Sequence, residues 1–298
     1  MIGPLDNLLN ITTDLFQKKE LKPVFAEISE TAKILWERGW AERNAGNFSI
    51  NITAYFHEKE LDRLSTYPFN PMPKSHPELA RKLILVSGTG TRMRDVFKNP
   101  QANVCFVYIS DTGSAYHIIS DTADKSTVRP TSELATHLAI QQLLLQKKAD
   151  EKVVLHAHVT KLIALTQILE YKTEDAINRL LWGMHPETVL FLPGGIGFIP
   201  FTVPGSEKIA TATIAGFQKH KVILWEKHGG MSVGKSIAEA FDHLDILAKS
   251  AKIFFLCKSA GLEPEGLTQS QVLDIRSTIS ANDSQILYNK KQLKTNDE

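Results

Sequence analysis

Short apolar segments alternate with longer segments of helical periodicity along most of this 298-residue chain, and this alternation limits the possible folds most strongly. Neither kind of segment is confined to one part of the chain, so the pattern predicts one α/β domain with helices packed on a mixed sheet. The predicted helices span residues 24–40, 130–144, 161–169, 207–219 and 237–257. The predicted strands span residues 48–55, 83–86, 104–110, 116–119, 153–159, 189–192 and 222–226.

Polar residues predict where several of these elements begin and end. Thr131 or Ser132 is expected to cap the helix that starts near residue 130, and Ser206 is expected to cap the helix over residues 207–219. Residues 57–80 contain four closely spaced prolines, which favours an ordered excursion over a domain linker. The polar tail beyond about Ser280 is expected to fray.

Charge and cysteine content narrow the class of protein. The net charge of +1 comes from 34 basic and 33 acidic residues, so there is no electrostatic reason to expect a nucleic-acid or anionic-membrane partner. Residues 1–10 lack the basic and apolar parts of a signal peptide, and no apolar stretch approaches the roughly 20 residues of a membrane helix. Cys105 and Cys257 form no metal-type or redox-type pair, which favours buried thiols in a reducing compartment. A cytoplasmic protein is therefore expected.

Three histidines form a candidate metal site. His156 and His158 are two residues apart in a predicted strand, so their side chains point to the same face. His228 follows another predicted strand and precedes Gly229–Gly230, where the backbone is expected to turn. Three neutral imidazoles suit zinc and leave a position open, as in catalytic sites. Partly buried histidines bonded to backbone, and a lone surface histidine, are the alternatives.

The roles of several further candidate site residues depend on their neighbours in space, which the spacing of residues in the sequence does not show. Glu133 is expected in the first turn of a helix, where the helix dipole alone explains an anionic side chain. Proximity to the histidines would instead make it an acid or base. Gly46–Asn47, Thr89–Gly90 and Thr131–Ser132 have little side-chain bulk and suit a phosphate group, although each is also an ordinary turn or cap.

A nucleotide-binding motif competes with this interpretation. Residues 229–236 read Gly-Gly-Met-Ser-Val-Gly-Lys-Ser and fit the P-loop pattern between a predicted strand and helix. Only 62 residues follow Ser236, and they show no further strand that ends in a magnesium-binding aspartate. Gly88 and Gly90 also lack the third glycine of a dinucleotide fingerprint, because position 93 is Met93. We therefore disfavour a P-loop nucleotidase.

At several of these positions the sequence resembles the class II aldolase family, and within it the rhamnulose-phosphate aldolases. These positions keep the family's order over about residues 24–256. They are Glu37 to Asn47, Pro130 to Leu134, His156-Ala157-His158, Leu162 to Thr166, Pro193 to Gly197, Val203 to Ser206 and Trp225 to Gly229.

The resemblance implies a three-layer α/β/α single domain around a largely antiparallel sheet. The domain would span residues 1–298, with a core at about 24–256, an N-terminal extension at 1–23 and a C-terminal helix and tail at 257–298. It also implies a homotetramer with active sites at subunit interfaces.

The resemblance also implies the roles of site residues. One zinc ion per subunit would be bound by His156, His158 and His228. Glu133 would be the acid/base, and a neighbouring subunit would supply Glu187 as a second acidic group. The phosphate pocket would contain Gly46, Asn47, Thr89, Gly90 and Ser132. Thr89 replaces a serine, and Gly194 stands where the family leads us to expect aspartate.

The implied reaction is reversible cleavage of L-rhamnulose 1-phosphate to dihydroxyacetone phosphate and L-lactaldehyde. Another sugar-phosphate aldolase, an epimerase or a dehydratase on the same scaffold would use the same zinc and phosphate residues. A nonenzymatic module like the adducin head domain is expected to have lost metal ligands. Because all three histidines and Glu133 are present, the sequence favours an enzyme acting on a sugar phosphate.

Overall fold

A nine-stranded sheet runs through the part of the chain that the computed structural model describes, residues 15–119 and 128–278. Its order is β2-β5-β4-β3-β1-β6-β9-β8-β7, and only the β7–β8 pair is parallel. The expected mixed, largely antiparallel sheet is therefore confirmed. The strands are β1 Asn47–Asn51, β2 Phe69–Pro71, β3 Leu83–Ser87, β4 Val104–Ile109, β5 Ala115–Ile119, β6 Val153–Ala157, β7 Gly197–Ile199, β8 Val222–Trp225 and β9 Gly229–Gly234.

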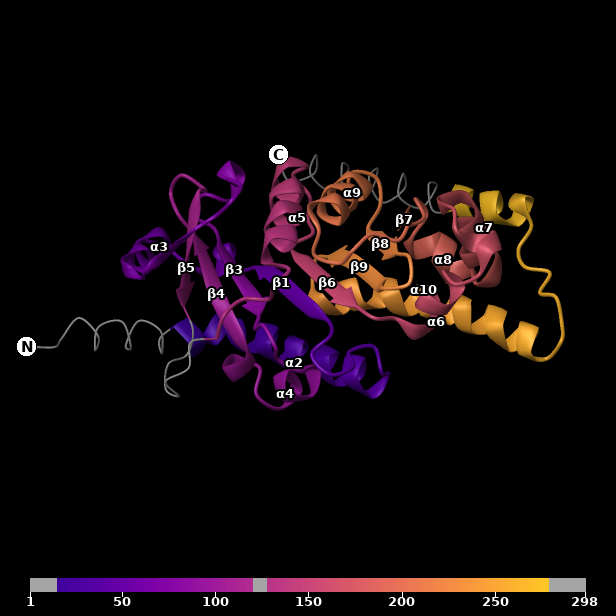
Figure 1. The fold of residues 1–298 in the computed structure, drawn as a ribbon, viewed down its shortest axis with the longest axis horizontal. Coiled ribbons are helices and arrows are strands. Elements are labelled where there is room, and N and C mark those ends of the chain that lie inside the picture. Colours follow the sequence, from indigo (N-terminus) through magenta and orange to yellow (C-terminus); the bar gives the residue numbers. More distant parts are fainter. Residues whose placement is uncertain (1–14, 120–127, 279–298) are drawn as a thin grey trace, which may run out of the picture.

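Helices cover both faces of this sheet, which confirms the three-layer arrangement (Figure 1). Helices α5 (Leu134–Gln146) and α9 (Glu207–Phe217) lie on one face. Helices α2 (Lys22–Glu37), α4 (Met93–Lys98) and α10 (Ile237–Ser259) lie on the other. Further α-helices are α3 Glu58–Asp62, α6 Thr160–Leu165, α7 Glu174–Met184 and α8 Pro186–Phe191, and residues 269–278 are helical as well. Short 3-10 turns occupy Lys19–Leu21, Thr53–Tyr55, Arg63–Thr66, Pro77–Leu79, Gln101–Asn103 and Leu169–Tyr171.

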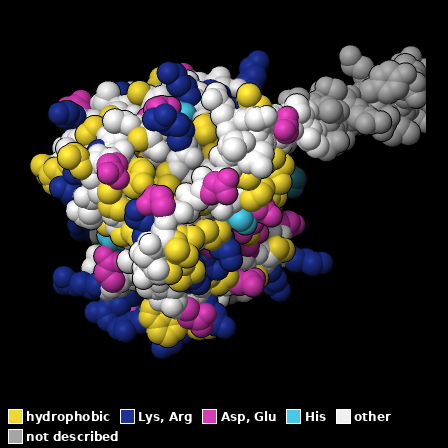
Figure 2. Space-filling view, turned by 90° about the vertical axis from the view of Figure 1, so that its right-hand side faces the viewer, with side chains coloured by type: hydrophobic (Ala, Val, Ile, Leu, Met, Phe, Trp, Pro, Cys, Tyr) yellow, Lys and Arg dark blue, Asp and Glu magenta, His cyan; other side chains and the backbone are white. Residues whose placement is uncertain are grey.

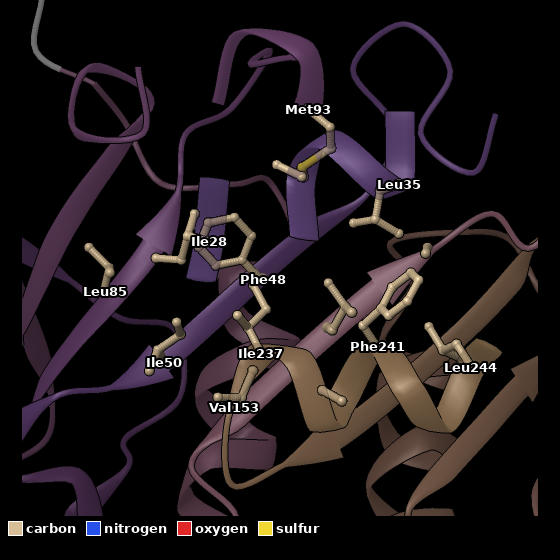
Figure 3. Close-up of a cluster of buried hydrophobic side chains, with 14 of the residues drawn as sticks. Ile28, Leu35, Phe48, Ile50, Leu85, Met93, Val153, Ile237, Phe241 and Leu244 are labelled. Atoms are coloured by element: carbon tan, nitrogen blue, oxygen red, sulfur yellow. The ribbon is translucent and has the colours of Figure 1, made fainter. Parts of the chain in front are cut away.

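The largest apolar cluster lies between the sheet and helices α2, α4 and α10. Ile28 of α2, Phe48 of β1 and Phe241 of α10 belong to it (Figure 3). Burying each such side chain stabilises the fold by roughly 1.5–3 kcal/mol. Because side chains alternate along a strand, Phe48 faces this cluster while Asn47 and Ser49 face α5 on the opposite side. The central strand β1 therefore carries polar groups beneath α5.

Helix starts agree in part with the predicted caps. Ser206 caps α9, since its hydroxyl accepts a hydrogen bond from the Ile209 N–H at 3.4 Å. The predicted cap of α5 is wrong: Glu133 occupies that position, with no side-chain cap hydrogen bond. The Thr131 hydroxyl instead accepts from the Glu133 N–H at 3.4 Å, so the helix begins slightly later than expected.

Two segments depart from the predicted elements. Residues 189–192 belong mostly to helix α8 rather than to a strand. Pro186 at the helix start favours this outcome, and a four-residue apolar run has no periodicity to distinguish the two structures. The strand expected over 48–55 ends at Asn51, and the chain then forms a 3-10 turn at Thr53–Tyr55. Helices α3, α4 and α7 and the edge strands β2 and β7 were not predicted.

The segment that fits the P-loop pattern is mostly a strand. Residues 229–234 form β9, which lies between β6 and β8 with both of its edges paired. A P-loop needs a loop whose backbone N–H groups are free to bind phosphate. Lys235 pairs with Asp150 at 3.0 Å, and Ser236 caps α10. The structure therefore supports the rejection of a nucleotide site.

Other expectations concern the surface and the chain ends. Basic and acidic side chains are interspersed on the face shown in Figure 2, in keeping with the near-zero net charge. No helix within residues 15–119 and 128–278 is long and apolar enough to cross a membrane. The expectations for residues 1–10 and for the tail beyond Ser280 lie outside the described residues. Cys105 is a buried free thiol and Cys257 a half-buried one.

Candidate metal centre

The three predicted histidines converge at one end of the central strands. His156 lies in β6, directly opposite Asn47 of β1, and His158 follows the end of β6. His228 lies in the short turn between β8 and β9, the strand next to β6. The ring centroids are 5.0 to 5.2 Å apart, and one nitrogen of each ring lies within 4.8 Å of the others. Such spacing suits three ligands of one metal ion.

Hydrogen bonds orient two of these rings toward the shared centre. The Nδ1–H of His156 donates to the Gly230 carbonyl at 3.0 Å, and the Nδ1–H of His158 donates to Glu42 Oε1 at 2.6 Å. In both rings Nε2 is thereby left with a free lone pair. His156 Nε2 and His228 Nδ1 are buried without a hydrogen-bond partner. Unpaired buried nitrogens are costly, so a bound cation is the natural partner for them.

The local electrostatics keep two of the imidazoles neutral. Burial, reinforced by the neighbouring His158 and His228, lowers the pKa of His156 well below its usual value. Burial and His158 also lower the pKa of His228, while the charge of Glu133 opposes this effect. Metal ligands must offer a lone pair, which only the neutral ring has. These two histidines are therefore ready to bind a metal at neutral pH.

Glu133 precedes the helix that packs beside these strands. His137, one turn later, lies with its Nε2 2.6 Å from Asn47 Oδ1, and Asn47 is the strand partner of His156. One carboxylate oxygen of Glu133, Oε2, is buried without a hydrogen-bond partner. A capping role does not explain this oxygen, because the side chain makes no cap hydrogen bond. The orphaned oxygen, like the orphaned imidazole nitrogens, points to an absent cation or to a reacting group.

The three predicted phosphate segments also meet here. Strand β1 begins beside the end of β3, its antiparallel neighbour. The residue after β3, Gly88, pairs with Pro130, and the Thr131 N–H donates to the Ser87 carbonyl at 2.9 Å. These contacts bring the segments at Asn47, at residues 89–90 and at Ser132 to one edge of the histidine cluster.

Not every predicted phosphate donor is free. The Thr89 N–H already donates to the Arg129 carbonyl at 2.8 Å, so this backbone donor is not free for a phosphate. Gly90 has a φ of 71° and would meet no atom within 4 Å if it had a side chain. Its conformation, rather than crowding, requires glycine. Gly46 has a φ of 79° and lies against the His156 carbonyl.

Glu187 is not brought to this cluster by any recorded contact within the described chain. It lies in the first turn of α8, just before the residues 189–192 that were expected to form a strand. Its carboxylate pairs with His185 Nε2 at 2.8 Å and its side chain is 46% exposed. Gly194, the second departure from the family pattern, accepts a hydrogen bond from His220 Nδ1–H at 3.0 Å.

The residues around the candidate ligands were not predicted from the sequence. Glu42 orients His158 across a separation of 116 residues. The Thr166 hydroxyl accepts from the Lys227 N–H at 2.8 Å, which fixes the turn before His228. His137 lies beside Asn47 in a buried polar group. Glu42 and Thr166 fall within the segments of family resemblance, but their contacts are long-range and have no local signal.

Known proteins share both the sequence and the fold. Residues 26–255 match the family described as the class II aldolase and adducin N-terminal domain. A rhamnulose-1-phosphate aldolase of Bacteroides thetaiotaomicron is 38% identical over 263 residues, covering 86% of this chain and 95% of that enzyme. A rhamnulose-1-phosphate aldolase of Listeria welshimeri is 33% identical and covers 78% of this chain and 82% of its own length.

Solved structures agree with this similarity. The crystal structure of a sugar-phosphate aldolase from Thermotoga maritima matches with a TM-score of 0.70 and 28% identity. The match covers 83% of this chain and all of that one. An L-fuculose 1-phosphate aldolase matches with a TM-score of 0.56 and 17% identity, over 87% of this chain and 97% of the other. The latter likeness concerns the fold alone.

Proposed function

Because this chain belongs to the class II aldolase and adducin N-terminal domain family, we propose that it is a metal-dependent aldolase that cleaves L-rhamnulose 1-phosphate. The products are dihydroxyacetone phosphate and L-lactaldehyde. The observation that carries this function is the cluster of three imidazoles, whose nitrogens lie within 4.8 Å of one another. It is supported by the buried, unpaired carboxylate oxygen of Glu133 at the start of the neighbouring helix α5. Relatives named rhamnulose-1-phosphate aldolase, 38% and 33% identical over most of their lengths, support the choice of substrate.

The metal is zinc, held by His156, His158 and His228. Three nitrogen ligands with an open position are typical of catalytic zinc, and the two buried unpaired nitrogens fit this donor set. A zinc ion there would supply Lewis-acid polarisation of the substrate's ketone and adjacent hydroxyl oxygens. The protein's own contribution is to fix the ring orientations through Gly230 and Glu42.

The substrate phosphate binds beside the histidines. Gly46, Asn47, Thr89, Gly90 and Ser132 line this position. Several donors around one anion orient the sugar so that its C3–C4 bond lies next to Glu133. When that bond breaks, Glu133 delivers a proton to C3, and it removes the same proton in the condensation direction. The proton of the C4 hydroxyl leaves as the aldehyde forms.

Glu187 assists at the C4 hydroxyl from a neighbouring subunit. Its exposed position on α8 leaves the carboxylate available to a second copy of the chain, and the enzyme is then a homotetramer with shared active sites. Replacing Glu187 with Gln should reduce kcat with zinc content and subunit number unchanged. Wild-type kcat in a tetrameric Glu187→Gln protein would exclude this role. We place the enzyme in the cytoplasm, where phosphorylated sugars are retained by their charge.

The test of Glu133 is its replacement by Gln, which keeps the size and removes the basic oxygen. The rate should fall on the order of 10²–10⁴-fold while zinc and phosphate binding persist. Solvent exchange of the C3 proton of dihydroxyacetone phosphate should fall in parallel, because this step needs only the metal and the base. Normal exchange in a zinc-loaded Glu133→Gln protein would assign the proton to another group.

A substrate panel tests the choice of sugar. Wild-type protein should cleave L-rhamnulose 1-phosphate faster than L-fuculose 1-phosphate, and it should not epimerise pentulose phosphates. Zinc content is measured in the same samples by metal analysis. A zinc-loaded protein that leaves L-rhamnulose 1-phosphate intact would refute the proposed function.

A further inference from the structure

A buried polar group lies between α5 and the sheet, and the proposed chemistry uses only one of its members, Asn47. His137 is fully buried on α5, one turn after Glu133, and Gln141 follows one turn later. Facing them on β1 are Asn47, 8% exposed, and the buried Ser49. Apolar clusters of α5 residues lie on either side of this group. Apolar side chains of the same shape would stabilise this position equally well, so stability alone does not explain the polar residues.

The hydrogen bonds of this group have one consistent direction. Gln141 Nε2 donates to the Lys152 carbonyl at 3.1 Å, which can only accept, so the orientation of this amide is determined. The same nitrogen donates to the Ser49 hydroxyl at 3.1 Å. The Ser49 hydroxyl lies 2.9 Å from His137 Nδ1 and donates to it. His137 Nε2–H then donates to Asn47 Oδ1 at 2.6 Å.

This direction determines which end of the Asn47 amide faces the substrate. The oxygen of Asn47 is occupied by His137, so its NH2 group remains free, with no hydrogen bond to the described residues. An anion needs donors, and an amide turned the other way would present its oxygen to the phosphate. Burial lowers the pKa of His137 to about 4, so the ring stays neutral and Nδ1 can accept from Ser49.

We infer that His137 is a positioning residue that holds the Asn47 amide with its NH2 group toward the substrate phosphate. The inference rests on the proposed phosphate pocket. One helix then serves both parts of the substrate: Glu133 at its start acts at C3, and His137 one turn later acts through Asn47 on the phosphate. The Gln141–Ser49 pair fixes the tautomer of His137. Because the Ser49 hydroxyl accepts from Gln141 and donates to Nδ1 of His137, the ring proton is on Nε2.

Two replacements of His137 separate this role from packing. Gln places an N–H near the position of Nε2 and can still donate to Asn47, whereas Met has a similar length and no donor. The affinity for inorganic phosphate, measured by calorimetry on the zinc-loaded protein, should fall on the order of 10- to 100-fold in His137→Met. It should fall much less in His137→Gln. In His137→Met, KM should rise as the phosphate affinity falls. The kcat at saturating substrate and the zinc content should change little.

A double-mutant cycle with Asn47→Ala tests whether His137 acts through this amide. In the Asn47→Ala background, His137→Met should have little further effect on phosphate affinity. Equal losses in both backgrounds, or an unchanged phosphate affinity in folded His137→Met, would overturn the inference. If His137→Met does not fold, Ser49→Ala replaces it, and the expected loss of phosphate affinity is smaller but of the same sign. Phosphate binding without aldol cleavage in the wild type would refute the proposed function alone.

Discussion

Glu42 offers a sharp test of the metal centre because it touches a ligand but not the metal position. Its carboxylate accepts the Nδ1–H of His158 at 2.6 Å, which fixes the ring orientation and leaves Nε2 as the ligand atom. Removing such a partner typically lowers metal affinity 10- to 100-fold. The Glu42 side chain is 64% exposed, so water screens the contact and can replace it. We therefore expect about a tenfold loss of zinc affinity in Glu42→Ala, or roughly 1.4 kcal/mol.

The measurement is a competition between the metal-free protein and a coloured chelator for zinc. Glu42→Gln keeps an acceptor oxygen without the charge and should lie between wild type and Glu42→Ala. Glu37→Ala is the matched control, because Glu37 is also exposed and its partner, Lys33, lies 3.9 Å away and outside the site. Equal zinc affinities in wild type and Glu42→Ala would refute the argument that this carboxylate supports His158.

Three further predictions concern other parts of the chain. Lys235→Ala should leave aldol cleavage unchanged, since Lys235 pairs with Asp150 at the surface; magnesium-dependent ATP binding lost in this variant would contradict the assignment of β9. Gly229→Ala should lower the free energy of unfolding by about 1–3 kcal/mol and lower the zinc content, because a Cβ would lie 2.5 Å from the Ala157 carbonyl oxygen. Full metal occupancy in this variant would contradict the expected loss of zinc. Acidification from pH 7 to 5 should destabilise the metal-free protein by about 2 kcal/mol through His137. Its folded pKa is about 4 and the unfolded value about 6.5, so this stability is lost as the pH falls through that window. Urea unfolding of wild type and His137→Gln checks this, and identical pH slopes would disprove it.

Local patterns determined the elements whose periodicity is long or whose caps are specific. The helix capped by Ser206 and the long helix from Ile237 were predicted closely, because apolar residues repeat over several turns. The common orientation of His156 and His158 was also predictable, since side chains two residues apart in a strand share a face. The predictions failed for short or glycine-rich segments. Residues 189–191 of α8 were predicted as a strand and Gly229–Gly230 of β9 as a turn, because neither segment has a periodicity of its own.

Only the tertiary structure decided what surrounds each candidate residue. Sequence spacing left Glu133 open as an ordinary helix-start anion or as an acid/base, and only the structure shows that one of its carboxylate oxygens is buried without a hydrogen-bond partner. Glu42 meets His158 across 116 residues, and His137 meets Asn47 across 90. The hydrogen bonds that orient metal ligands and donors form between segments distant in the chain, so no local pattern encodes them. The sequence by itself identified the family and the three candidate metal ligands, while sheet pairing and helix packing decided which partners orient these side chains.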